Sequence, residues 1–188
     1  MRVFDFDGTI YDGESSVDFF LFSLKRHPKN LLLLPRVFYM LLRYKRLKIT
    51  PDELAAGLEK YGARFLSGIN DLSGDIVKFW DGHFHKIKQF YLEGKLDDDV
   101  ILSASPDFLI VEAAKRLGIK TVIASSFDLE KGKILRLCYH ENKCEYFSLQ
   151  FPDKRIDEFY TDSDNDKAVF KLSDRVFMVK GNKITERK

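Results

Sequence analysis

Two hydrophobic patterns divide the chain. Short apolar runs bounded by turn residues, which are typical of buried strands, occur at the start and in the second half. We expect strands at 3–4, 100–103, 121–124, 159–161 and 176–179, and a β-hairpin over 127–137. Between residues 14 and 96 the apolar positions recur at helical spacing instead. This middle stretch is therefore expected to be a helical insert without strands.

Capping and helix-breaking residues set the expected helix boundaries. Helices are expected from Ser15 or Ser16 to Leu24, over 31–44 with a kink or restart at Pro35, from Pro51, over 71–92, from Pro106 to Leu117, and over 168–172. Thr50 is the predicted N-cap of the helix at Pro51, and Glu53 would close a capping box. Because strand and helix alternate after residue 97, we expect an α/β fold with a parallel sheet covered on both faces.

Composition is that of a globular protein with a substantial core. Of the 188 residues, 45% are hydrophobic and 14% aromatic, and no apolar run reaches the length of a membrane span. The first chemically informative motif starts at residue 5, which leaves no room for a leader, so a cytoplasmic location is expected. Cys138 and Cys144 are expected to be free thiols, because nothing argues for a disulfide framework or a thiolate metal site.

Charge is unevenly distributed. The net charge is +2, yet residues 19–51 contain no acid and carry a local charge of +8 from Lys25, Arg26, Lys29, Arg36, Arg43, Lys45, Arg46 and Lys48. The remaining sequence holds 23 bases and 29 acids, a balance of −6. Such segregation indicates that the basic stretch faces something anionic.

The residues Asp5 and Asp7 follow the first predicted strand. In an open α/β sheet, ligands bind beyond the carboxyl ends of the strands, which is where both carboxylates are expected. Gly8 allows the backbone to turn sharply there, so the two side chains point in different directions and can hold different roles. Alone, the motif is also compatible with an ordinary turn.

Three further groups are placed at the same edge by the pattern. Ser103 ends the second strand, Asp162-Ser163-Asp164-Asn165-Asp166 follows the fourth, and Lys143 lies at a predicted helix start. Each has a plain alternative: a turn serine, a helix-capping acidic loop and a solvated lysine. A calcium loop is disfavoured, because the sequence from Val169 onward is apolar.

In this order, the four groups resemble the haloacid dehalogenase superfamily of phosphohydrolases. The resemblance implies a Rossmann-like core from residues 1–13 and 97–188, with a small helical cap over 14–96. It also implies an aspartyl-phosphate intermediate, with Asp5 as the nucleophile and Asp7 as the general acid and base. A dehalogenase would not need the acid at Asp7, since halide leaves without a proton, so we expect a phosphatase.

The resemblance also implies the ligands of the reaction. Mg²⁺ would be held by Asp5, the main-chain carbonyl of Asp7, Asp162 and Asp166. A small phosphorylated substrate would be contacted by Thr9, Glu14, Ser103, Ala104 and Lys143. Ser103 would donate to the phosphoryl oxygens, and Lys143 would stabilise charge in the transition state. Glu14 has an alternative reading as an acid that favours the helix N-terminus.

Two branches of the superfamily are similar to this chain. The position of the helical insert and of Glu14 resembles subfamily IB, the phosphoserine phosphatases, although Ser103-Ala104-Ser105-Pro106 departs from the Ser-Gly-Gly of that branch. The same four residues and Cys138–Lys143 look like phosphatidylglycerophosphatase C, a lipid-phosphate hydrolase. Residues 25–48 would then touch an anionic membrane; an ordinary bundle that buries its leucines is the other interpretation. A phosphotransferase and an inactive binding module also stay open, and no nucleic acid is expected as a partner.

Overall fold

The computed structural model describes residues 1–46, 48, 51–129 and 133–187. The strands are β1 Arg2–Phe4, β2 Val100–Pro106, β3 Thr121–Asp128, β4 Lys133–Arg136, β5 Ile156–Thr161, β6 Ser173–Lys180 and β7 Lys183–Glu186. The α-helices are α1 Ser15–Arg26, α2 Leu34–Lys45, α3 Pro51–Ser67, α4 Leu72–His83, α5 Gln89–Gly94, α6 Asp107–Leu117, α7 Glu141–Gln150 and α8 Lys167–Phe170. Short 3-10 helices are η1 Pro28–Leu33, η2 Phe84–Lys86 and η3 Asp164–Asp166.

The seven strands of the described residues form one sheet, in the order β4-β3-β2-β1-β5-β6-β7. The five central strands are parallel, whereas β4 and β7 pair antiparallel at the two edges. This confirms the expected α/β fold. β1 lies in the middle, with Phe4 opposite Ile101 of β2 and Tyr160 of β5. The residues that follow β1 therefore emerge between the ends of two other strands.

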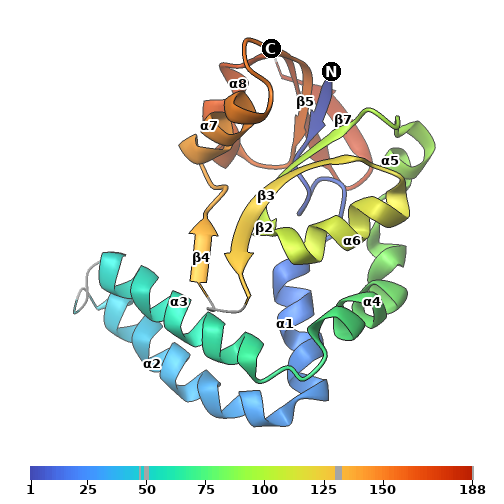
Figure 1. Ribbon diagram of the computed structural model, residues 1–188. Helices are drawn as coiled ribbons and strands as arrows, with labels where there is room; N and C mark the ends of the chain where they lie inside the picture. Colours follow the sequence, from blue (N-terminus) through green and yellow to red (C-terminus); the bar gives the residue numbers. More distant parts are fainter. Residues whose placement is uncertain (47, 49–50, 130–132, 188) are drawn as a thin grey trace.

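Alternating side chains build a core on each face of the sheet. Phe4 and Ile101 join one cluster with helices α1, α4, α5 and α6. Val3, Val100 and Leu102 point the other way, into a cluster with α7 and α8. Figure 1 shows α7 and α8 on one side of the sheet and α5 and α6 on the other. Both faces are buried, as parallel strands require.

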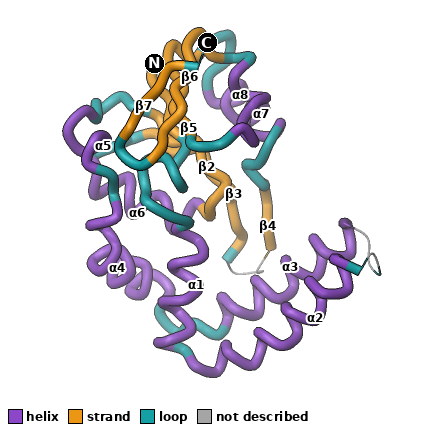
Figure 2. Tube along the Cα trace, turned by 180° about the vertical axis from the view of Figure 1, so that it is seen from behind, coloured by secondary structure: helices purple, strands orange, loops and turns teal. Residues whose placement is uncertain are grey.

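The helical insert has two parts. Helices α1 and α4 pack beside the sheet and contribute to one of its hydrophobic clusters. Trp80 of α4 donates from Nε1 to the carbonyl of Leu109 in α6 at 2.9 Å. Helices α2 and α3 form a hairpin that passes the end of β4, with α3 on the side of the sheet and α2 beyond it (Figures 1 and 2). The first part shares one continuous hydrophobic cluster with the sheet. The division of the chain into a core and a cap stays a prediction.

Two expected elements differ from the structure. The helix predicted over 71–92 is broken, since α4 ends at His83 and Ile87 forms an isolated β-bridge with Tyr11. The main-chain bonds of the segment at Ile87 go to the loop after β1 instead of continuing a helix. Strand β7 was not predicted: its partner β6 ends at Lys180, and Gly181 with a φ of 59° turns the chain back.

Helix starts and turns show smaller differences. The N-cap of α1 is Glu14, which makes no side-chain capping bond, so the predicted caps Ser15 and Ser16 are wrong. Pro35 is the second residue of α2, as a restart requires. The predicted cap Thr50 and the tip of the 127–137 hairpin lie outside the described residues; the hairpin itself is confirmed by the pairing of Phe127 with Ile134.

Among the described helices, none has both the length and the apolar character needed to cross a bilayer.

One buried carboxylate ties α1 to α4. Asp75 is 2% exposed and accepts hydrogen bonds from Arg26 Nε, at 2.7 Å, and from His27 Nε2. Burial alone would raise the pKa of Asp75, but the hydrogen bonds from His27 and Arg26 outweigh burial and hold this pKa below its usual value. The folded state therefore favours the ionised carboxylate.

We expect Asp75→Asn to lower the free energy of unfolding at pH 7 by about 1–3 kcal/mol, because it removes a buried, bonded charge. The stabilisation is complete above the ordinary carboxyl pKa of about 4 and is lost as the pH falls through the lower pKa of the folded state. Urea unfolding at a series of pH values should thus show wild type and variant converging in acid. Asp97→Asn, at an exposed site, is the control. A difference that stays constant down to acid pH would contradict this role.

Candidate active site

The loop after β1 is held by main-chain bonds at both ends. The amide of Asp5 donates to the carbonyl of Tyr160 at 2.9 Å, and the amide of Gly8 donates to Gly13 at 2.9 Å. Gly8 has a φ of 70°, a left-handed value that glycine adopts without strain. A methyl group there would lie 2.1 Å from Oδ2 of Asp162, so only glycine lets that carboxylate approach the loop.

A buried lysine joins two of the predicted carboxylates. Lys143, 3% exposed and in the first turn of α7, donates to Asp5 Oδ1 at 2.9 Å and to Asp166 Oδ1 at 2.7 Å. The other oxygen of Asp166 accepts from Thr161 Oγ1 at 2.8 Å. Both carboxylate oxygens of Asp166 therefore accept hydrogen bonds: Thr161 holds the carboxylate in place, and the carboxylate positions Lys143. A direct role of Asp166 as a metal ligand stays a prediction.

Electrostatics leave this cluster short of positive charge. Burial raises the pKa of Asp5 to about 7, although Lys143 opposes the shift. Burial alone would lower the pKa of Lys143, but the attraction of Asp5 and Asp166 outweighs it and raises that pKa. Lys143 is thus held as a cation, while one ammonium shared by two carboxylates does not keep Asp5 fully ionised at neutral pH.

The carboxylate of Asp7 points into a different hydrogen-bond network. Its Oδ1 accepts from the amide of Ser15 at 2.6 Å, and its Oδ2 accepts from Ser105 Oγ at 2.5 Å. Burial raises the pKa of Asp7 in spite of these bonds. A carboxyl held in this way, with a raised pKa, suits proton transfer. Asp5 and Asp7 therefore have different hydrogen-bond partners, and their separate roles in a reaction stay a prediction.

Strand β2 brings Ser103 to the same place. Its Oγ accepts from the amide of Ser105 at 3.1 Å, which leaves its proton available to a ligand. The carbonyl of Ala104 accepts from Ser125 Oγ at 2.7 Å, which fixes the main chain there. Thr9 is fully buried, and its Oγ1 is among the buried polar atoms of the described residues that have no hydrogen-bond partner. Substrate contacts by these residues stay predictions.

Asp162 and Glu14 lie next to the loop. The carboxylate of Asp162 packs against Gly8, and burial raises its pKa. Burial, followed by repulsion from Asp7 and Asp162, also raises the pKa of Glu14. The structure therefore gathers the predicted acids Asp5, Asp7, Asp162 and Glu14 at one end of the sheet.

The oxygen-rich loop can hold a hard cation. Within the part of the chain that the structure describes, no three His, Cys, Asp or Glu side chains are grouped as a ready metal site. The predicted set, however, combines two carboxylates, from Asp5 and Asp162, with the main-chain carbonyl of Asp7. Such donors are those that Mg²⁺ prefers. Burial raises the pKa of Asp5 and of Asp162, and a bound cation would favour the ionised form of each carboxylate. The residues therefore fit Mg²⁺.

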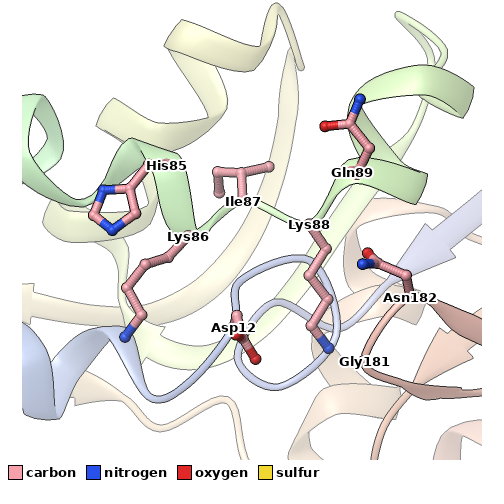
Figure 3. A pocket seen from close by; sticks show the side chains of 8 residues that line it. All are labelled: Asp12, His85, Lys86, Ile87, Lys88, Gln89, Gly181 and Asn182. Atoms are coloured by element: carbon pink, nitrogen blue, oxygen red, sulfur yellow. The ribbon is translucent and has the colours of Figure 1, made fainter.

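Lys88 is a contact of this loop that sequence reasoning missed. It is 7% exposed, and its Nζ donates to the carbonyl of Gly8. The amide of Lys88 donates to the carbonyl of Ile10 at 2.8 Å, and the amide of Asp12 donates to the carbonyl of Lys86 at 2.8 Å. These main-chain hydrogen bonds hold residues 86–88 against the loop after β1. Figure 3 shows the Lys88 side chain reaching toward the Asp12 loop, beside a cavity of about 530 Å³. Residue 88 falls within the helix expected over 71–92, where a lysine is expected to face solvent, so the sequence did not indicate this contact.

The chain matches a protein-family model over most of its length. The model of the haloacid dehalogenase-like hydrolases matches residues 3–171, which include every residue placed at the site above. Among curated proteins, none matches the chain significantly.

Solved structures share the fold over most of their length. A protein of unknown function from Bordetella pertussis Tohama I has a TM-score of 0.72 at 18% identity, covering 94% of this chain and 87% of that one. A phosphoserine phosphohydrolase-like protein from Francisella tularensis subsp. tularensis SCHU S4 has a TM-score of 0.53 at 15% identity, covering 93% and 84%. Cytosolic 5'-nucleotidase IIIB bound to cytidine has a TM-score of 0.53 at 16% identity, covering 96% and 72%. At these identities, the likeness establishes the fold.

We expect Lys88→Met to lower kcat by about 10-fold or more, because the carbonyl of Gly8 loses its buried donor and the loop loses its position. Lys86→Met is the matched control: that lysine lies two residues away and pairs with Asp18 instead. Steady-state kinetics with an aryl phosphate, together with urea unfolding, would separate a catalytic loss from a loss of folded protein. Equal kcat in the two variants would contradict a specific role for Lys88.

Proposed function

Because the chain belongs to the haloacid dehalogenase-like hydrolase family, we propose that it is a Mg²⁺-dependent phosphatase that acts on phosphate monoesters through an aspartyl-phosphate intermediate. The observation that carries this proposal is the separate environment of two neighbouring carboxylates. Asp5 is paired with the buried ammonium of Lys143, whereas Asp7 is held by Ser15 and Ser105. One carboxylate suits attack on phosphorus, and the other suits proton transfer.

In the first step, an oxygen of the Asp5 carboxylate attacks phosphorus, and the bond from phosphorus to the leaving oxygen breaks. Asp7 gives its proton to that oxygen, so the product leaves as an alcohol. Lys143 and the hydroxyl of Ser103 stabilise the charge on the phosphoryl oxygens. Lys143 bonds Asp5 Oδ1, which directs the nucleophile while the ammonium faces the developing negative charge.

In the second step, water attacks the phosphorus of the aspartyl phosphate and gives a proton to Asp7. The bond between phosphorus and the Asp5 oxygen breaks, which regenerates the carboxylate and releases inorganic phosphate. Asp7 begins and ends the cycle protonated, so the two steps balance. The hydrogen bonds from Ser105 and from the amide of Ser15 hold the Asp7 side chain in one position, from which it serves the leaving oxygen in the first step and the water in the second.

Mg²⁺ would be bound by Asp5, Asp162 and the carbonyl of Asp7, where it would offset the acid charge and the charge of the substrate phosphate. Asp166 would act through Lys143 and Thr161. The helical insert over 14–96 would act as a cap that covers the site and shapes the pocket for the leaving group. Glu14 and Thr9 would contact the substrate from the loop between the core and the insert.

We expect Asp5→Asn to lower kcat with an aryl phosphate and Mg²⁺ by about 10³-fold or more, since an amide is a poor nucleophile. Asp98→Asn is the matched control, because Asp98 is exposed and precedes the start of β2, at the end of the strand away from the site. The substrates should include phosphoserine and a nucleoside monophosphate, in view of the two named phosphatase neighbours. Full activity of Asp5→Asn would refute the proposed mechanism.

A second variant tests proton transfer. We expect Ser105→Ala to lower kcat by about 10-fold for an alkyl phosphate and much less for 4-nitrophenyl phosphate, because only the alkoxide needs the proton of Asp7 on leaving. The control is Ser67→Ala, whose hydroxyl bonds a helix carbonyl on the exposed surface. An equal loss for both substrates would mean that Ser105 does not act by positioning the general acid.

A further inference from the structure

The outer side of helix α2, with one residue before the helix and one after it, carries a mixed stripe of apolar and basic residues. Leu32, Arg36, Tyr39, Arg43 and Arg46 follow one another at spacings of four, three, four and three. Residues at this spacing lie along one side of a helix. Arg36 donates from Nη1 to the carbonyl of Leu32 at 2.9 Å, which shows that the stripe continues across the start of α2. Phe38 does not belong to this stripe but is exposed beside it, next to Tyr39. We call the five residues of the stripe and Phe38 the α2 face.

The α2 face is separate from the surface that packs against the rest of the protein. Leu33 and Met40 are buried, and the Met40 sulfur lies where a methyl group on Gly57 of α3 would be. In contrast, Leu32 is 71% exposed, and Phe38 and Tyr39 are each 64% exposed. The segment therefore buries some of its apolar side chains, as a bundle would, and still presents three large ones to solvent.

The charge of the α2 face is of one sign. Residues 19–51 contain eight bases and no acid, and Lys25, Lys29, Arg36, Arg43 and Arg46 are exposed. Among the described residues, Arg36 and Arg43 donate hydrogen bonds to the main-chain carbonyls of Leu32 and Lys48, and a neutral carbonyl does not cancel the charge of a guanidinium group. A partner of this face should therefore be anionic.

The position of α2 leaves its outer side accessible. Helix α3 contacts both α2 and β4, and Glu59 of α3 accepts from the amide of Ile134 at 3.2 Å. In both views α2 lies at the outer edge of the hairpin, and α3 lies between it and the sheet (Figures 1 and 2). A broad surface can approach α2 without touching the site at the strand ends.

We propose that the α2 face docks the protein on an anionic membrane surface. Lipid headgroups offer the negative charge that the arginines require, and the acyl boundary beneath them takes up Leu32, Phe38 and Tyr39. A nucleic acid would pair with the arginines, but its phosphate backbone would not bury the exposed apolar side chains such as Leu32. The proposal does not depend on the reaction catalysed, and its test needs no turnover.

The experiment is co-sedimentation of the full chain with vesicles of phosphatidylcholine that contain about one third phosphatidylglycerol. Binding is expected at low salt, with little binding to pure phosphatidylcholine and loss of binding as salt rises. Arg36→Glu with Arg43→Glu should weaken binding about 10-fold or more, since each cation near such a surface raises affinity several-fold. Phe38→Ser with Tyr39→Ser, which leaves the charge unchanged, should also weaken binding several-fold through the apolar contribution.

Matched controls lie on helix α6 and after it. Lys115→Glu with Lys120→Glu makes the same change in charge at exposed positions, and Val111→Ser removes an exposed apolar side chain. These controls should bind as wild type does, and circular dichroism would confirm that all variants are folded. The proposal is overturned if wild type does not bind anionic vesicles at low salt, or if control and α2 variants lose binding equally. Binding to single-stranded RNA without binding to vesicles would overturn it as well.

Discussion

The Lys143 ammonium, buried between the carboxylates of Asp5 and Asp166, is the interaction on which the site depends. It connects three parts of the chain that are far apart in sequence: the end of β1, the first turn of α7 and the 3-10 helix after β5. A buried charge is costly unless it is paired, so the two ion pairs constrain how these elements meet. Removal of either carboxylate would leave a charge in the interior without its full compensation.

This constraint also explains why the site calls for a further cation. One ammonium is shared by two acids, and Asp162 is brought close by the absence of a side chain at Gly8. Burial raises the pKa of Asp5 and of Asp162, which means that their ionised forms are incompletely stabilised. A bound divalent cation would offset the negative charge of these carboxylates. The proposed chemistry and the proposed Mg²⁺ therefore rest on the same electrostatic observation.

Local patterns in the sequence predicted the elements that are determined locally. The buried strands are apolar runs in the sequence, and Asp5, Asp7 and Asp162 directly follow such runs, which is enough to predict that they lie at strand ends. Features that depend on contacts between distant segments were missed. The helix predicted over 71–92 is broken because Ile87 pairs with Tyr11, and Lys88 reaches the carbonyl of Gly8 through the same contact. Strand β7 carries little apolar sequence, and its pairing with β6 follows from the turn at Gly181.

The most direct test of the account is to look for phosphate on Asp5 itself. Wild-type protein with Mg²⁺ and an aryl phosphate would be quenched in acid during turnover, digested, and analysed by mass spectrometry. The account predicts a phosphorylated peptide from the loop after β1, with the acyl phosphate on Asp5 and its loss on treatment with hydroxylamine. Steady turnover with a phosphorylated residue elsewhere, or with no phosphorylated enzyme at any stage of the reaction, would contradict it.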